Sequence, residues 1–150
     1  MSSNNSQEPF NTYSQLLDRT AKRVKQYAQN HFNEHNFGIT VDQWSILKIL
    51  KFTDCNLSQK ELAELCEKDQ ASLTRIVDIL VNKNLVERSI HPQDRRSFFI
   101  HLTPSGKKKV DEIYPLIAEM RLKAWENLDE SDFEHLKRIL NTIYNNLNIE

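Results

Sequence analysis

The stretch from Asp94 to Gly106, DRRSFFIHLTPSG, constrains the fold of this sequence more than any other. It places two arginines side by side, then a short apolar segment, and then a Thr-Pro pair. Threonine is a favoured helix N-cap, and proline suits the first helical position because its missing N–H needs no partner there. The sequence therefore predicts a basic turn, a strand and a capped helix in immediate succession, with the helix beginning at Pro104.

The composition favours helices around that feature. A chain of 150 residues is long enough for one domain with a substantial core. It contains only two glycines and four prolines, which are too few for the many tight turns of a large sheet. We expect residues 1–9 to form a disordered leader and residues 10–150 to form one mainly α domain with a small β-hairpin, an α+β fold.

The sequence also indicates a compartment. No apolar run approaches the roughly 20 residues that a membrane-spanning helix requires. The amino terminus, MSSNNSQEP, is polar and lacks the basic-then-apolar pattern of a secretory signal. We therefore expect a cytoplasmic protein with no membrane partner, in which Cys55 and Cys66 are thiols.

Capping boxes and apolar periodicity locate the central helices. Thr40 and Gln43 have capping-box spacing, and Ser58 and Glu61 repeat it. The short helix after Ser58 is followed by a polar break and by another helix, whose apolar stripe is Leu73, Ile76, Val77 and Leu80. Two short helices separated by a few polar residues predict a helix-turn-helix.

A β-hairpin is expected directly after these helices. Residues 85–90 and 97–102 can pair as two strands joined by a loop that runs from His91 to Arg95. Pro92 lies in that loop, where it is compatible with a hairpin tip, whereas it would disrupt a central strand.

Two longer amphipathic segments flank this lobe in the sequence, over about residues 10–36 and 104–147, with Asp129 as the N-cap of the last helix. Neither has a wide enough partner surface within a compact lobe of residues 40–103. We expect their apolar stripes to bury against each other and against a second copy of the chain. The candidate dimer-interface residues are Tyr13, Leu17, Leu136, Leu140, Ile143 and Leu147.

The distribution of charge favours a nucleic-acid partner, although the net charge is −1. Residues 88–109 contain six basic side chains and one acidic side chain, whereas residues 110–150 contain four basic and nine acidic side chains. A basic segment of this kind is the electrostatic footprint of a surface that binds DNA.

Side-chain chemistry suggests which residues contact the DNA. Arginine and glutamine in the first turns of the second short helix can bridge guanine and adenine, and arginines at the hairpin tip fit a narrow minor groove. The start of the first short helix offers donors to phosphate, and we expect Asp94 to orient a neighbouring arginine through a salt bridge. The candidate DNA-binding residues are Ser58, Gln59, Gln70, Ala71, Ser72, Thr74, Arg75, Arg88, Asp94, Arg95 and Arg96.

The spacing of the opening stretch also resembles a known signature. The pattern Asp-x-Arg, five residues, Leu-Thr, two residues, Gly is that of the MarR family of bacterial transcription regulators, and every fixed position is filled, by Asp94, Arg96, Leu102, Thr103 and Gly106. The order of the helices and the stretch LTRIVDILVNKNLVERS resemble the same family, so that the likeness covers about residues 10–147.

The resemblance implies a winged helix-turn-helix over about residues 40–103, flanked by dimerisation helices over about 10–36 and 104–147. It implies a sequence-specific DNA-binding regulator without enzymatic activity or cofactor. Members commonly act as repressors that bind a pseudo-palindromic operator as homodimers and release it when a small molecule or oxidant acts. Asn84 stands where members often have glycine, and asparagine tolerates the left-handed backbone that such a turn needs.

Aromatic residues suggest where an effector binds. Members of the family bind small phenolic or lipophilic molecules in a cleft between the dimerisation helices and the winged lobe, and a small aromatic or lipophilic effector is expected here as well. The candidate pocket residues are Phe10, Tyr13, Phe32, Trp44 and Phe52.

Three alternatives to a ligand-released regulator remain. A redox-responsive regulator would use Cys55, and a winged-helix dimer could serve mainly as a protein-interaction module. A metal-responsive regulator is the third, because zinc-responsive members of the family use acidic, His and Cys ligands near the first two helices. Those members also use histidines from the helix after the wing, and this chain has none between Gly106 and Trp125. Separately, His31, Glu34 and His35 spell the H-x-x-E-H pattern of a class of zinc peptidases. That pattern arises by chance in so short a form, and the chain lacks room for a peptidase cleft, so we expect no metal site and no catalysis.

Overall fold

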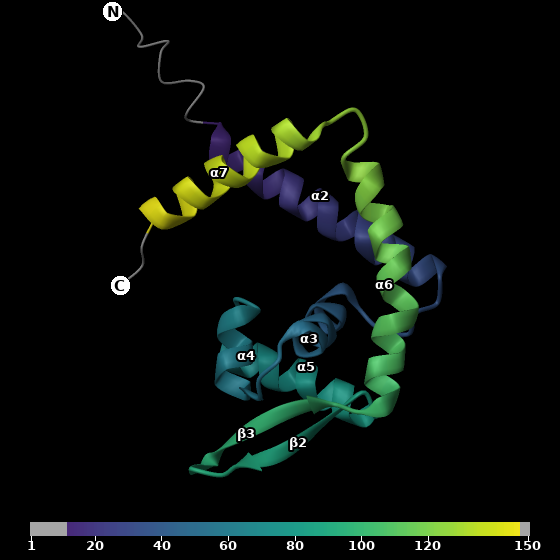
Figure 1. Ribbon diagram of the computed structural model, residues 1–150, viewed down its shortest axis with the longest axis vertical. Coiled ribbons are helices and arrows are strands. Elements are labelled where there is room, and N and C mark those ends of the chain that lie inside the picture. Colours follow the sequence, from purple (N-terminus) through teal and green to yellow (C-terminus); the bar gives the residue numbers. More distant parts are fainter. Residues whose placement is uncertain (1–11, 148–150) are drawn as a thin grey trace, which may run out of the picture. The chain divides into compact units, whose positions relative to one another are not determined.

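The structure is a computed structural model that describes residues 12–147, and it divides into two compact units at Ile117/Ala118 (Figure 1). Each unit is described by itself. The predicted leader, residues 1–9, and Phe10 lie outside the described residues. The elements along the chain are α2 (Tyr13–Glu34), α3 (Val41–Phe52), β1 (Leu57–Ser58), α4 (Gln59–Leu65), α5 (Gln70–Asn82), β2 (Val86–His91), β3 (Asp94–Leu102), α6 (Pro104–Ala124) and α7 (Glu130–Asn146).

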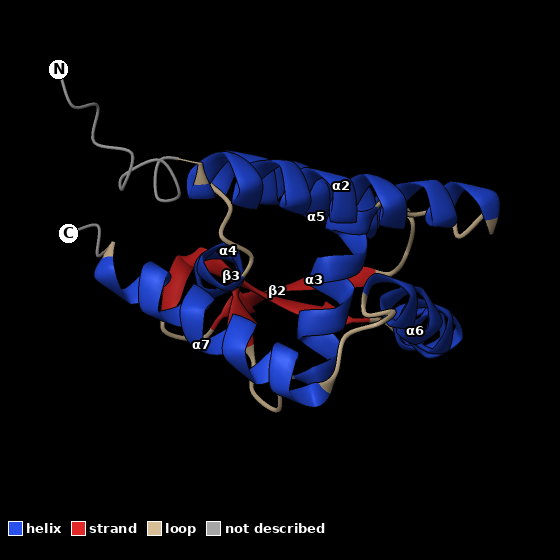
Figure 2. Cartoon of the chain, turned by 90° about the horizontal axis from the view of Figure 1, so that it is seen from above, coloured by secondary structure: helices blue, strands red, loops and turns tan. Residues whose placement is uncertain are grey.

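Helices make up most of the described chain, and the strands are confined to one small sheet (Figure 2). The predicted fold class, mainly α with a small β-hairpin, is therefore confirmed. Within residues 12–147, none of the helices is both long enough and apolar enough to cross a bilayer.

The helices begin at the side-chain caps that the sequence predicts. Thr40 Oγ1 accepts a hydrogen bond from the Gln43 N–H at 3.2 Å, and the Gln43 side chain accepts one from the Thr40 N–H. Ser58 and Glu61 form the same reciprocal pair at the start of α4, and Asp129 caps α7. These bonds satisfy backbone donors that have no partner inside the helix, which is why α3, α4 and α7 begin where they do.

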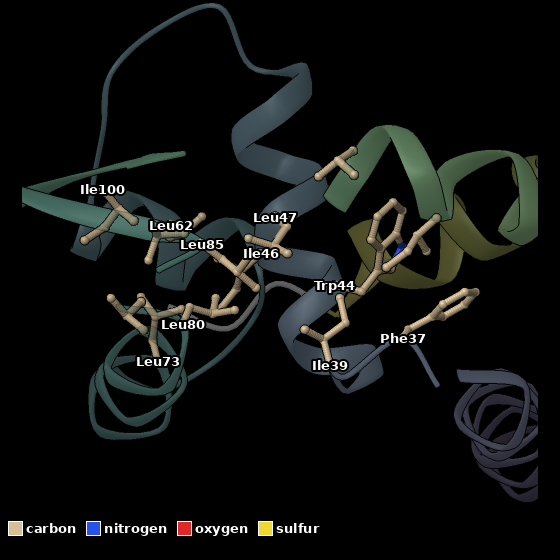
Figure 3. Close-up of a cluster of buried hydrophobic side chains, with 14 of the residues drawn as sticks. Phe37, Ile39, Trp44, Ile46, Leu47, Leu62, Leu73, Leu80, Leu85 and Ile100 are labelled. Atoms are coloured by element: carbon tan, nitrogen blue, oxygen red, sulfur yellow. The ribbon is translucent and has the colours of Figure 1, made fainter. Parts of the chain in front are cut away.

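The core of the first unit lies between the helix-turn-helix and the sheet. Leu47 from α3, Leu62 from α4, Leu80 from α5 and Ile100 from β3 are almost completely buried and point toward one another (Figure 3). Burial of a leucine or isoleucine side chain stabilises a fold by about 1.5–3 kcal/mol. The apolar stripes predicted for the two short helices therefore hold them against the hairpin as one lobe.

The sheet is antiparallel, with strand order β1-β3-β2. Its β2–β3 ladder pairs Val86 with Leu102 and continues to Ile90 and Phe98. β1 was not predicted, because a strand of two residues carries no periodicity that a sequence pattern can show. It pairs with the middle of β3 and so fastens the start of α4 to the wing.

The hairpin tip differs from the prediction. β3 begins at Asp94, which pairs with His91, so that the turn contains only Pro92 and Gln93. The register then shifts between His91 and Ile90, which leaves residues 95–97 of β3 without partners on β2. Arg95, which was expected in the loop, and Arg96 therefore both lie in a bulged strand. A bulge bends the strand and redirects its side chains.

The junction between the wing and α6 forms as the Thr-Pro pair predicts. Thr103 Oγ1 accepts a hydrogen bond from the Gly106 N–H at 3.0 Å, and its hydroxyl donates to the Asn84 carbonyl at 2.6 Å. Asn84 has a φ of 57°, which confirms that it takes the left-handed conformation. One side chain thus caps α6 and ties it to the turn that precedes β2.

Ion pairs attach α2 to the lobe. The Asp42 carboxylate at the start of α3 lies 3.0 Å from Lys25 Nζ of α2 and 3.3 Å from Lys68 Nζ in the turn between α4 and α5. Partial burial raises the pKa of Asp42, but hydrogen bonds from the two ammonium groups outweigh it and hold the pKa below its usual value. Asp42 is therefore ionised at neutral pH and connects three elements.

The second unit has almost no core of its own. No residue of α7 is buried, although its apolar residues recur along one face. Trp125 and Phe133 pack edge to face, with ring centroids 5.3 Å apart, at the turn that joins α6 to α7. An amphipathic helix with an uncovered apolar face needs a partner. The described face consists of Phe133, Leu136, Leu140, Ile143 and Leu147.

Candidate nucleic-acid interface

The outward face of α5 carries the predicted base-contacting side chains. Its opposite face, with Leu73, Val77 and Leu80, is completely buried, so the orientation of the helix is fixed. Gln70 and Arg75 are exposed at its first two turns, and within residues 12–147 their side chains make no hydrogen bond or ion pair. Ala71 is exposed beside them. This arrangement leaves an amide, a guanidinium and a methyl group available to a ligand.

Ser72 lies at the edge of that face and takes part in the helix cap. Its backbone N–H donates to Asp69 Oδ1 at 2.8 Å and its hydroxyl donates to Asp69 Oδ2 at 2.8 Å. Asp69, in the polar break between the two short helices, is the N-cap of α5. The Ser72 hydroxyl is thus occupied at the start of the helix.

Ser58 has a structural role at the start of α4. This residue was expected to offer its hydroxyl to phosphate, but it is only 8% exposed and its Oγ accepts the Glu61 N–H at 3.1 Å. The capping box that located the helix is the physical reason, because it holds the Ser58 side chain against the first turn of α4. Gln59, the next residue, is half-buried at the start of α4.

Two caps of the helix-turn-helix are carboxylates with lowered pKa values. The hydrogen bond from the Ser58 backbone is the main reason that the pKa of Glu61 falls below its usual value, and a bond from the Ser72 backbone does the same for Asp69. Both groups are therefore ionised at neutral pH, and each places negative charge at a helix N-terminus, where it is favourable.

Four of the predicted DNA-binding residues bond to one another. The Gln59 side-chain amide donates to Thr74 Oγ1 at 2.7 Å, and the Thr74 hydroxyl donates to the Gln70 carbonyl at 2.8 Å. Arg88 on β2 places a guanidinium nitrogen 2.6 Å from Asp78 Oδ1 on α5, and its Nε lies 3.4 Å from Gln59 Oε1. Asp78, which is exposed on α5, is not among the residues that the sequence predicts to contact DNA.

The wing presents both predicted arginines to solvent. Arg95 and Arg96 are exposed, and within residues 12–147 neither guanidinium has a hydrogen-bond or ion-pair partner. Asp94 does not form the expected salt bridge with either of them. Its Oδ1 accepts the Arg96 backbone N–H at 3.0 Å. Because the acceptor holds the backbone, Asp94 shapes the bulge and leaves both arginine side chains free.

The described residues of the predicted aromatic pocket have different surroundings. Phe32 and Trp44 are buried in the core of the first unit, whereas Phe52 is 58% exposed and its ring packs against Tyr114 at 5.2 Å. Tyr13 lies at the other end of α2 from Phe32, about 28 Å away at 1.5 Å per residue. Phe32 and Trp44 do contact each other, because both are buried in the same core.

A different cavity lies at the corner between α2 and α3. It has a volume of about 410 Å³, and among the predicted residues that fall within 12–147 Phe32 alone lines it. Lys83, the C-cap of α5, forms one wall and donates to the Gly38 carbonyl and, at 3.3 Å, to Gln43 Oε1. The other lining residues are Gln29, Asn33, Asn36, Gly38, Ile39 and Thr40.

The structure also shows the surroundings of the histidines and cysteines that the metal-responsive and redox-responsive alternatives would use. Among residues 12–147, no three His, Cys, Asp or Glu side chains lie close enough to hold a metal ion. The His35 ring stacks on Phe37, with ring centroids 5.3 Å apart. Burial raises the pKa of the Cys66 thiol, which disfavours the reactive thiolate, whereas Cys55 is exposed.

Comparisons with known proteins agree with this geometry. A sequence profile of the MarR family matches residues 39–98. YhbI of Bacillus subtilis, an HTH-type transcriptional regulator, is 30% identical over 135 residues that cover 88% of this chain and 86% of YhbI. The B. subtilis transcriptional repressor YetL is 27% identical over 124 residues, which cover 80% of this chain and 74% of YetL.

A solved structure extends the similarity to three dimensions. S. aureus MepR, in a crystal structure of its complex with DNA, superposes with a TM-score of 0.82 and 28% sequence identity, and the match covers 91% of this chain and 98% of MepR. The winged lobe, the profile and a 30% identical relative along most of the chain lead to one assignment. The protein belongs to the MarR family of helix-turn-helix, DNA-binding transcriptional regulators.

Proposed function

We propose that this protein is a repressor that binds a pseudo-palindromic operator as a homodimer and releases it when a small molecule binds. The observation that carries the proposal is the set of unpartnered polar side chains on one lobe. Gln70 and Arg75 project from α5, and Arg95 and Arg96 project from the wing. A recognition helix beside a basic wing suits base contacts in the major groove and an arginine in the minor groove.

The homodimer follows from the uncovered apolar faces. α7 has no buried residue, and on α2 the side chains of Tyr13 and Leu17 are exposed by 43% and 38%. A second copy of the chain supplies a self-complementary cover for both faces. Two lobes related by a two-fold axis then match two operator half-sites. The repressor assignment is supported by the similarity to YetL, a transcriptional repressor.

A binding selection over genomic DNA tests the DNA-binding proposal. The purified full chain is expected to enrich fragments that share an inverted repeat. Enrichment without a common sequence would contradict a sequence-specific regulator and would favour the alternative of a protein-interaction module. The position of the enriched sites relative to promoters distinguishes repression from activation.

Arg96→Ala is expected to weaken binding to the selected operator by roughly tenfold, because a guanidinium in a narrow groove is lost. The slope of log Kd against log salt concentration should also fall by about 0.9 for each phosphate contact removed. Fluorescence anisotropy across a salt titration measures both quantities. Arg138→Ala, which removes the same charge from the polar side of α7, is the matched control and should leave the affinity unchanged. Equal affinities of wild type and Arg96→Ala at every salt concentration would refute the wing assignment.

For the effector, we propose the cavity at the α2–α3 corner in place of the predicted aromatic set. Lys83 joins that cavity to the end of α5, so a ligand that competes for its ammonium group alters the support of the recognition helix. The mixed lining, with Phe32 and Ile39 beside Asn33 and Gln29, suits a small aromatic molecule that carries a polar group.

Asn33→Trp is expected to fill this cavity and to abolish ligand-induced release of DNA. Operator affinity should stay within about twofold of wild type, as for most substitutions at the surface. Small phenols and aromatic carboxylates serve as probes, with DNA release followed by anisotropy. Asn30→Trp, one turn away on α2 and outside the cavity, is the matched control and should keep the response. Release of Asn33→Trp by the same probe at the same concentration would place the effector elsewhere.

A further inference from the structure

The contacts among Asp78, Arg88, Gln59 and Thr74 form a continuous chain, called here the lobe network. It connects three elements, since Asp78 and Thr74 belong to α5, Gln59 to α4 and Arg88 to β2. Arg88 joins Asp78 at 2.6 Å and Gln59 at 3.4 Å, and Gln59 joins Thr74 at 2.7 Å. Each of these distances spans elements that are far apart in the sequence or separated by a turn.

The lobe network occupies polar groups that the sequence assigned to DNA. Both ends of the Gln59 amide are engaged, because its nitrogen donates to Thr74 and its oxygen accepts from Arg88. The Thr74 hydroxyl accepts one bond and donates another to the Gln70 carbonyl. The Arg88 side chain is 25% exposed, in contrast with the unpartnered guanidinium groups of Arg95 and Arg96.

The position of Arg88 explains what the network can do. In the sheet it pairs with Ile100, whose side chain is buried in the core of the first unit. Its guanidinium therefore extends from an anchored part of the wing to the outward face of α5. A planar guanidinium that bonds two acceptors fixes both distance and orientation, which a single ammonium cannot do.

We propose that the lobe network positions the wing against the recognition helix and makes no contact with DNA. Asp78 and Arg88 are positioning residues, and base recognition falls to Gln70, Ala71 and Arg75, with the wing arginines beside them. This inference rests on the proposed DNA-binding function. It separates the residues of the lobe network from the residues that contact bases, whereas the sequence analysis listed Gln59, Thr74 and Arg88 among the DNA contacts.

The sign of one substitution tests the proposal. If Asp78 acts only through its charge, Asp78→Asn removes a negative group near DNA and tightens binding. If Asp78 positions Arg88, the same variant weakens operator binding, by roughly threefold to tenfold for a partly exposed coupled pair. Glu87→Gln is the matched control. It removes the same charge from the neighbouring position on β2, where Glu87 is exposed and forms no ion pair within residues 12–147, and it should bind as tightly as wild type or more tightly.

Arg88→Lys provides a second test that does not depend on a change of charge. Lysine keeps the positive charge but cannot bond Asp78 and Gln59 together, so the proposal predicts the same threefold to tenfold loss, of about the size expected for a coupled pair. The salt dependence of Arg88→Gln should equal that of wild type. A phosphate contact would instead be replaced well by lysine, and its removal in Arg88→Gln would lower the slope by about 0.9.

A double variant and a selection complete the experiment. Asp78→Asn combined with Arg88→Gln should bind no more weakly than either single variant, because each already breaks the network. In a binding selection, both single variants should keep the wild-type sequence preference, whereas Arg75→Ala should lose preference at one position of each half-site. Circular dichroism melts confirm that each variant is folded at the assay temperature.

The possible outcomes are distinct. If wild type binds no operator, the proposed function fails before this inference is tested. If wild type binds and Asp78→Asn binds more tightly, or Arg88→Lys binds as wild type does, the positioning role is wrong. Additive losses in the double variant, or an altered sequence preference for Arg88→Gln, would likewise make Arg88 a DNA contact.

Discussion

Leu136→Asp is expected to abolish dimerisation and, with it, to weaken operator binding by at least about 100-fold. Leu136 is 42% exposed on the apolar face of α7, between Phe133 and Leu140, where the proposed partner copy packs. An unpaired carboxylate buried there costs several kcal/mol, which exceeds what one leucine contact contributes to the interface. The chain then remains monomeric, and each lobe binds a half-site alone.

The expected size of the effect comes from the geometry of two linked lobes. Binding of the first lobe raises the effective concentration of the second at its half-site, so that linkage can increase the affinity by about 10²–10⁴. The monomeric variant should therefore bind at least about 100-fold more weakly. Sedimentation equilibrium gives the oligomeric state, and anisotropy on the same samples gives the affinity.

Arg138→Asp is the matched control for Leu136→Asp. Arg138 lies about 200° around α7 from Leu136, at 100° per residue, so its substitution places the same carboxylate on the polar face. This control should remain dimeric and bind the operator. A monomeric Leu136→Asp with wild-type affinity would show that DNA binding does not require the dimer, and a dimeric Leu136→Asp would place the interface elsewhere.

Gly106→Ala is expected to destabilise the protein by about 3 kcal/mol, at the upper end of the cost of overpacking. A Cβ atom at Gly106 would lie 2.0 Å from the Leu85 carbonyl oxygen and 3.1 Å from Leu102 Cδ2. The Leu85 oxygen already accepts the Thr103 N–H at 3.1 Å, so it cannot retreat without breaking that bond. Relief requires the first turn of α6 to move away from β2.

Thermal unfolding tests the prediction for Gly106. A loss of 3 kcal/mol corresponds to a fall of roughly 6–12 °C in Tm for a chain of this size. Ser105→Ala, one residue away on an exposed position of α6, is the control and should change Tm little. Equal melting temperatures of Gly106→Ala and wild type would show that the close approach to Leu85 does not constrain this position. Position 106 therefore requires glycine, because any side chain there would collide with the Leu85 carbonyl.

Features that depend on neighbours in the sequence were predictable. The starts of α3, α4 and α6 rest on hydrogen bonds between residues i and i+3, so the caps at Thr40, Ser58 and Thr103 were visible in the chain. The apolar stripe of α5 follows from the helical period and fixed which side of it faces outward. The same local logic places Arg75 on the outward face and Gln70 on its flank near the start of the helix.

Features that depend on distant parts of the chain were missed. The hydroxyl of Ser58 and the amide of Gln59 looked equally available, yet one caps α4 and the other bonds to Thr74. The bulge at the arginine pair depends on which residue of β2 faces each residue of β3, and alternation alone does not determine register across a turn. The aromatic set was grouped by side-chain type, although only the packing decides which rings meet.

By itself, then, the sequence determined the helices and their caps, the outward face of α5 and the presence of a basic hairpin followed by a capped helix. Only the tertiary structure decided that Arg88 bonds to Asp78, that the wing arginines have no partner among the described residues, and that Gly106 lies against Leu85. The physical reason is the distance along the sequence over which each interaction acts. Capping and periodicity act within a few residues, whereas a salt bridge between β2 and α5 exists only after the core has brought both elements together.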